Sequence, residues 1–139
     1  MDIEEIYNFL EKSQGVNKGK LTPKADLCHD LGIDGDDFFE LIEDFSSRYN
    51  VSMKNYCWYF HHKEEGLNLG ALFSPAPYQQ VNRIPITPEI LLLAATNKIW
   101  PITYPEHKIS SRRTENLINK IFITILLGFV VTCIVSELA

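Results

Sequence analysis

The sequence predicts an all-α protein, a small helical bundle followed by a single C-terminal transmembrane helix. Three observations predict this fold class. Apolar residues recur at helical spacing, capping residues precede these runs, and an uncharged apolar stretch lies near the C-terminus. The 139 residues have room for one domain of ordinary size. We divide them into a helical domain at residues 1–102, a basic juxtamembrane linker at 103–116 and a transmembrane anchor at 117–138.

A first helix is predicted to begin after Asp2. Glu5 lies three residues further on and completes a capping box, and Gly15 is a natural stop. The helix would bury a stripe formed by Ile3, Ile6, Tyr7 and Leu10. We expect it to serve core packing alone.

A second helix is predicted from about Asp36 to Asn50, after a long connection at residues 16–33. Asp34 stands where an N-cap belongs. The apolar stripe of this helix consists of Phe38, Leu41, Ile42, Phe45 and Tyr49. Its other positions include Asp36, Asp37, Glu40, Glu43 and Asp44, with no Lys or Arg before Arg48. The helix is therefore expected to bury one side and to present a strongly acidic other side.

The start of this helix resembles that of acyl carrier proteins. Carriers read Asp-Leu-Gly-x-Asp-Ser-Leu-Asp, and residues 30–37 read Asp-Leu-Gly-Ile-Asp-Gly-Asp-Asp. The resemblance places Gly35 where carriers have the serine that bears phosphopantetheine, which implies that this chain has no cofactor. A glycine has no hydroxyl group to esterify.

The chain is also similar to an enterobacterial family of small acyl-carrier-like proteins of unknown function that lack this serine. The similarity rests on residues 32–37, on Tyr59-Phe60-His61 and on the segment from Pro85-Ile86-Thr87 to Trp100. It covers residues 3 to 100 and implies an acyl-carrier-like helical bundle.

In acyl carriers the matching helix face docks on basic patches of partner enzymes. The resemblance therefore implies a protein partner with a basic patch. The expected partner-binding residues are Asp34, Asp36, Asp37, Phe39, Glu40 and Glu43. Phe39 lies off the apolar stripe and suits an exposed anchor within a charged rim. The alternative is a solvated face that keeps the protein soluble, with Phe39 as a second, partly buried edge.

The aromatic segment at residues 54–62 holds Cys57 and His61 four residues apart, a spacing that suits zinc or a Cys–His nucleophile pair. Cys28-His29 would have to supply further ligands, and paired Cys-x-x-Cys motifs are lacking. We therefore predict no metal site and no enzyme. Trp58, Phe60 and Tyr56 are expected to fill the core, with the histidines at its edge.

Residues 66–82 are expected to form a loop in which Leu67, Leu69, Leu72 and Phe73 act as apolar pins. A last domain helix is predicted after Thr87, with Pro88 at its first position. This helix is apolar on nearly every side and should be the most buried of the domain.

The stretch 121–136 contains no charged residue, and Leu117, Ile118 and Leu138 extend it to the length of a membrane span. The basic residues Lys108, Arg112 and Arg113 precede it, so the positive-inside rule predicts a cytoplasmic N-terminal domain. We expect a single-pass protein of the bacterial inner membrane. The net charge of −5 argues against nucleic acid as a partner.

Together these features predict a non-catalytic, membrane-tethered adaptor that binds a protein partner through its acidic helix face. Two alternatives remain open. The chain is a carrier modified at a non-standard residue, or it is a small membrane effector or regulator whose tail acts on the membrane.

Overall fold

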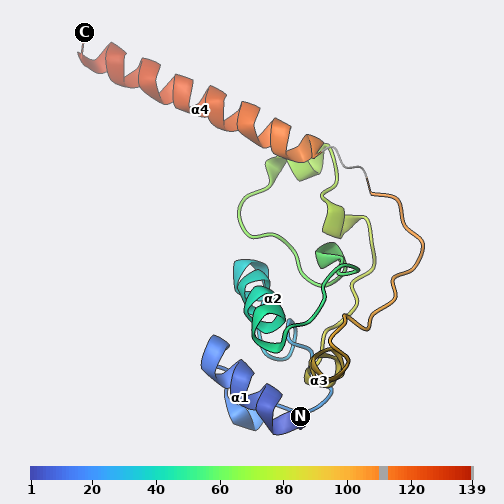
Figure 1. Cartoon of the computed structure of the whole chain (residues 1–139). Coiled ribbons are helices and arrows are strands. Elements are labelled where there is room, and N and C mark those ends of the chain that lie inside the picture. Colours follow the sequence, from blue (N-terminus) through green and yellow to red (C-terminus); the bar gives the residue numbers. More distant parts are fainter. Residues whose placement is uncertain (110–112, 139) are drawn as a thin grey trace. The chain divides into compact units, whose positions relative to one another are not determined.

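A computed structural model describes residues 1–109 and 113–138, and it confirms the all-α prediction. Within these residues the regular elements are helices, apart from an isolated β-bridge between Ser52 and Ile99. The chain forms two compact units (Figure 1). The N-terminal unit comprises Met1–Glu65 and Val81–His107, and the C-terminal unit comprises Gly66–Gln80 and Lys108–Ala139.

Three α-helices build the N-terminal unit: α1 (Ile3–Gln14), α2 (Gly35–Tyr49) and α3 (Pro88–Asn97). Their starts follow the predicted caps. The Asp2 side chain accepts a hydrogen bond from the Glu5 backbone N–H, and Thr87 accepts one from Ile90. Gly15 ends α1 in the left-handed conformation, as predicted. A 3₁₀ turn, η1 (Lys18–Lys20), lies in the connection to α2.

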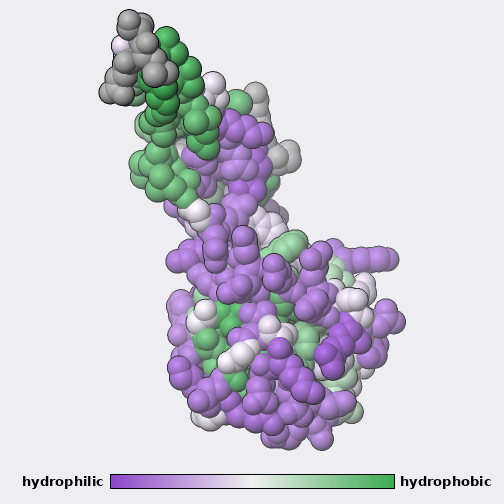
Figure 2. Space-filling model, turned by 90° about the vertical axis from the view of Figure 1, so that its left-hand side faces the viewer, coloured by the Kyte–Doolittle hydropathy of each residue, from purple (hydrophilic) through white to green (hydrophobic). Residues whose placement is uncertain are grey.

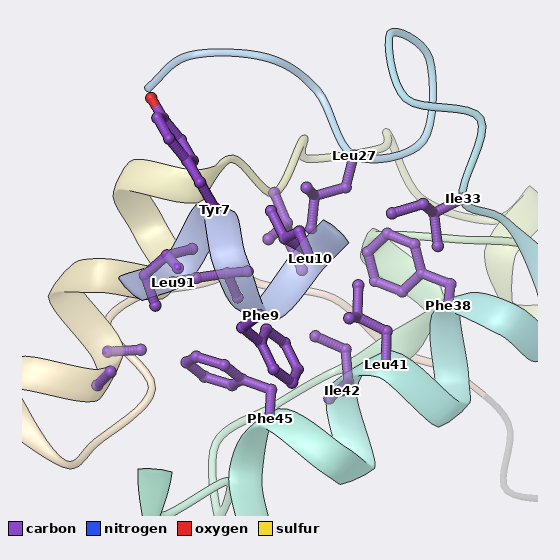
Figure 3. Packing of buried hydrophobic residues seen from close by; sticks show 14 of the residues in the cluster. Tyr7, Phe9, Leu10, Leu27, Ile33, Phe38, Leu41, Ile42, Phe45 and Leu91 are labelled. Atoms are coloured by element: carbon purple, nitrogen blue, oxygen red, sulfur yellow. The ribbon is translucent and has the colours of Figure 1, made fainter. Parts of the chain in front are cut away.

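The core lies where α1, α2 and α3 meet (Figure 3). Phe9 of α1 packs against Phe45 of α2, with ring centroids 6.0 Å apart. Leu27 and Ile33 of the long connection are also buried in this core. The prediction that α3 is the most buried helix is wrong at Leu93, which is 48% exposed. Leu91, Ala94 and Ala95 suffice to attach α3 to the core.

The aromatic segment, with η2 (Trp58–Phe60), holds a buried histidine. His61 is 1% exposed, so the prediction that it lies at the core edge is wrong. Its Nδ1 donates to the Ile84 carbonyl (2.8 Å), and its Nε2 accepts from the Tyr104 hydroxyl (2.6 Å). Because both ring nitrogens have partners, burial is tolerated. Trp58, expected in the core, is half-buried.

The C-terminal unit combines two 3₁₀ turns, η3 (Leu69–Leu72) and η4 (Pro77–Gln79), with the long helix α4 (Thr114–Leu138). In α4 the stretch Thr114–Ser136 is long and apolar enough to cross a membrane, and no residue of its most apolar 18-residue window is buried. Its surface is largely hydrophobic, whereas that of the N-terminal unit is mostly hydrophilic (Figure 2). The prediction that Leu67, Leu72 and Phe73 pin their loop to a core is wrong, since all three are exposed.

Candidate acidic helix face

The exposed side of α2 carries the acidic residues that the sequence singles out. Phe38, Leu41, Ile42 and Phe45 turn inward. The opposite side exposes Asp36, Asp37, Phe39, Glu40, Glu43 and Asp44. One amphipathic helix thus separates the core from a carboxylate-rich surface.

Phe39 lies within this acidic surface and is 52% exposed. It is three residues after Asp36 and four before Glu43, so both carboxylates are its neighbours on the helix. About half of the Phe39 side chain is therefore accessible to a partner. The arrangement combines an accessible aromatic ring with surrounding negative charge, which suits contact with an apolar group flanked by cations.

The carboxylates of Asp36, Asp37, Glu40 and Glu43 have no lysine or arginine partner among the residues that the structure describes. Asp36 and Asp37 occupy the first turn of α2, where the helix dipole favours negative charge. Unneutralised charge on one helix face produces a field that attracts basic partners over distances of about a Debye length, roughly 8–10 Å.

Asp34 differs from the other predicted contact residues because its carboxylate is engaged within the protein. It accepts hydrogen bonds from the backbone N–H groups of Gly35 (2.9 Å) and Lys63 (3.4 Å). The Lys63 ammonium lies 3.5 Å away. Burial alone would raise the pKa of Asp34, but these hydrogen bonds and the Lys63 charge hold that pKa below its ordinary value. Asp34 therefore acts as the cap of α2.

Gly35 begins α2 in the left-handed conformation, with φ of 57°. A Cβ built on Gly35 would lie less than 3.0 Å from the side chain of Glu65, a distance that real Cβ atoms do not show. Any side chain at position 35 is therefore strained, and it also requires Glu65 to move. The positive φ at this position explains why the sequence has a glycine here.

Glu65 extends the acidic surface beyond α2, and sequence reasoning missed it. Its segment is positioned by His62, whose ring stacks on Phe38 with centroids 4.8 Å apart. His62 is 6% exposed, and its Nε2 has no hydrogen-bond partner within the described residues. Burial lowers the pKa of His62. The charge run Lys63-Glu64-Glu65 was the available signal, but nothing local connects it to α2.

The cysteines and histidines considered for zinc do not converge. The described residues contain no group of three or more His, Cys, Asp or Glu side chains able to hold a metal ion. Both nitrogens of His61 are bonded to protein partners, and burial lowers its pKa to about 4. Cys28 and Cys57 are free thiols. Burial and the nearby Asp34 carboxylate raise the pKa of Cys28, which disfavours the reactive thiolate.

Comparison with known proteins relates this sequence to two groups. Residues 2–98, which include α1, α2 and α3, match the family described as "Protein of unknown function (DUF1493)". An acyl carrier protein of Chlorobium phaeobacteroides is 32% identical to this chain over 50 residues, which are 36% of this chain and 64% of that protein. The matched segment thus spans less than two thirds of that relative's length. No solved structure matches the chain. Since the family match covers well over half of the sequence, the chain belongs to the DUF1493 family.

Proposed function

We propose that this protein is a non-catalytic, membrane-tethered adaptor that binds a protein partner through the acidic face of α2. The observation that carries the proposal is this face itself. Asp36, Asp37, Glu40 and Glu43 are exposed around Phe39, and they lack cationic partners among the described residues. The proposed contact set omits Asp34, which is engaged as the helix cap. The partner supplies a basic patch with an apolar group for Phe39.

The start of α2 supports recognition without covalent cargo. Similarity to an acyl carrier protein raises the question of where a prosthetic arm would be attached. Position 35, which the resemblance aligns with the carrier serine, offers no hydroxyl, and its positive φ and its closeness to Glu65 disfavour any side chain. In this proposal the protein retains a docking helix like that of a carrier but carries no acyl group.

The proposed tether is α4, crossing the bacterial inner membrane once with the N-terminal unit in the cytoplasm. The most apolar 18-residue window of Thr114–Ser136 has a mean hydropathy of 2.3, and no residue of that window is buried. Lys108 and Arg113 both precede the helix, in agreement with the positive-inside rule. Tethering confines the acidic face to a thin layer and so raises its effective concentration toward membrane-associated partners.

Site-specific photo-crosslinking in intact membranes tests the docking face. A photoreactive phenylalanine analogue is placed at Phe39, and in a matched protein at Leu93 on α3. The two positions are both apolar and almost equally exposed, at 52% and 48%. We expect discrete adducts from position 39 and none from position 93. The adducts should weaken as salt rises, because electrostatic steering is screened.

Charge reversal then connects the adducts to the acidic face. Asp36→Lys with Glu40→Lys should abolish the adducts from position 39. The matched variant Glu4→Lys with Glu5→Lys changes the net charge equally at exposed positions of α1 and should leave them intact. Equal loss in both variants would mean that net charge, and not this face, governs capture.

An intact-mass measurement separates the adaptor from a carrier modified elsewhere. After co-expression with a phosphopantetheinyl transferase, the adaptor should retain its unmodified mass. A mass increase equal to one phosphopantetheine arm would instead establish a carrier, and peptide mapping would locate the modified residue.

A further inference from the structure

The segment Leu67–Phe73 exposes large apolar side chains outside any core. Leu67 is 84% exposed, Leu72 79% and Phe73 69%. The segment contains no charged residue. The surface of a soluble protein normally exposes large apolar side chains singly. Several of them in one short segment therefore indicate an interaction surface.

This segment is fixed to the first turns of α4 by specific contacts (Figure 1). The backbone N–H of Gly70 donates to Oδ1 of Asn119 (2.7 Å). Nδ2 of Asn119 donates to Oδ1 of Asn68 (2.8 Å). The ring of Phe73 stacks near that of Phe122, with centroids 6.3 Å apart. Wherever the start of α4 lies, the segment accompanies it.

The contact covers the polar part of α4. A Cβ on Gly70 would lie less than 3.0 Å from the backbone of Glu115, so glycine is what permits the close approach. Glu115 is 2% exposed and pairs with Arg113. The segment thus covers Glu115 and forms a hydrogen bond with Asn119, while Leu67, Leu72 and Phe73 remain largely exposed.

An open groove of about 340 Å³ lies along this contact. It is lined by Leu67, Leu69, Asn119, Phe122, Ile123 and Leu126. Apart from the Asn119 amide, every lining side chain is apolar. The groove therefore continues the apolar surface of α4 and contains no charged group that would recognise a polar ligand.

The length of α4 indicates what the surface meets. Its uncharged part, residues 121–136, is roughly 24 Å long at 1.5 Å per residue, whereas a bilayer core is about 30 Å thick. Matching the bilayer brings Leu117, Ile118 and Asn119 to membrane depth, with Lys120 extending toward the headgroups. Lipid offers an amide no hydrogen-bond partner at that depth, and Gly70 and Asn68 supply these partners.

We propose that Leu67–Phe73 is embedded with α4 in the interfacial layer of the bilayer, where Leu67, Leu72 and Phe73 contact lipid acyl chains. The segment extends the apolar surface of the span over its polar first turns. This inference rests on the proposed membrane anchoring by α4, and its test distinguishes the two.

Tryptophan quenching by brominated lipids tests the proposal on the full chain reconstituted in phosphatidylcholine vesicles. Phe73→Trp reports on the segment and Phe129→Trp on the middle of α4. Leu93→Trp is the matched control at an exposed apolar position of the N-terminal unit. The unsubstituted protein, with Trp58 and Trp100, gives the background.

Lipids with bromines near the headgroup end of the acyl chain should quench the added tryptophan fluorescence of Phe73→Trp. We expect this loss to be at least half of the loss that bromines at the chain end cause in Phe129→Trp. Leu93→Trp should show no loss above background. Quenching of Phe129→Trp without quenching of Phe73→Trp would overturn the inference and leave the anchor standing. Quenching of Phe73→Trp by iodide would then mean that water surrounds this position. Protection from iodide would mean that protein, such as a second copy of the chain, covers it. Absence of quenching in Phe129→Trp would overturn both the anchor and the inference.

Discussion

Replacing Gly35 by alanine tests the claim that the start of α2 excludes a side chain. Gly35 has φ of 57°, and its Cβ would collide with Glu65. A left-handed residue with a Cβ costs about 1–2 kcal/mol. Displacing the exposed Glu65 side chain adds to this, so we expect a total loss of about 2 kcal/mol in the free energy of unfolding.

For a domain of this size, each kcal/mol lowers Tm by roughly 4–8 °C, so Gly35→Ala should lower Tm by roughly 10 °C. The assay is thermal unfolding of the full chain in detergent micelles, followed by the fluorescence of Trp58 and Trp100. Gly32→Ala is the matched control, because Gly32 also has a positive φ (75°) but no atom within 4 Å of its Cβ. Gly32→Ala should therefore lower the free energy of unfolding only by the cost of placing a Cβ on a left-handed residue.

The double variant Gly35→Ala/Glu65→Ala should lose only as much unfolding free energy as Gly32→Ala, because the collision is removed and the conformational strain remains. A Gly35→Ala protein as stable as the unsubstituted chain would refute the reasoning. Position 35 would then accept a side chain, and the argument against covalent cargo would be reduced to the missing hydroxyl.

Three further predictions concern other contacts. Lowering pH from 6.5 to about 4 should destabilise the fold by up to about 3 kcal/mol, because burial holds the pKa of His61 at about 4 and the unfolded chain binds the proton first. His61→Phe should remove this part of the pH dependence of unfolding. Arg83→Met should lower the free energy of unfolding by about 1–3 kcal/mol, because it leaves the largely buried Asp26 carboxylate without its bidentate partner. Lys63→Met removes an exposed pair and should lower it by less than about 1 kcal/mol in the same thermal assay. Gly70→Ala should separate η3 from α4 and increase chymotryptic cleavage after Leu72 and Phe73, while Gly128→Ala, whose Cβ meets no atom within 4 Å, should not.

The helices could be predicted from the sequence because their signals are local. Caps at Asp2, Asp34 and Thr87 and apolar residues at helical spacing specify where α1, α2 and α3 begin to within one or two residues. The acidic face of α2 followed from the same periodicity. A charged residue that alternates with a buried stripe on one helix has nowhere to lie except the surface.

The aromatic segment could not be predicted in the same way. His61 is buried because Ile84 and Tyr104, which lie 23 and 43 residues away in sequence, satisfy its two nitrogens. Tyr104 also accepts from Trp100 (2.8 Å), so four residues form one network. Only the folded chain brings these groups together, and a histidine in sequence carries no signal of its partners.

The two proposed surfaces each combine a helix that the sequence reveals with a loop that it does not. At α2 the loop contributes Glu65, and at α4 the loop contributes Leu67–Phe73. Each loop approaches its helix at a glycine, since Gly35 meets the Glu65 side chain and Gly70 meets the Glu115 backbone. A glycine in sequence permits a close approach but does not identify what approaches. Because the glycines differ, Gly35→Ala perturbs the start of α2 and Gly70→Ala perturbs the contact of Leu67–Phe73 with α4, so the two surfaces can be tested separately.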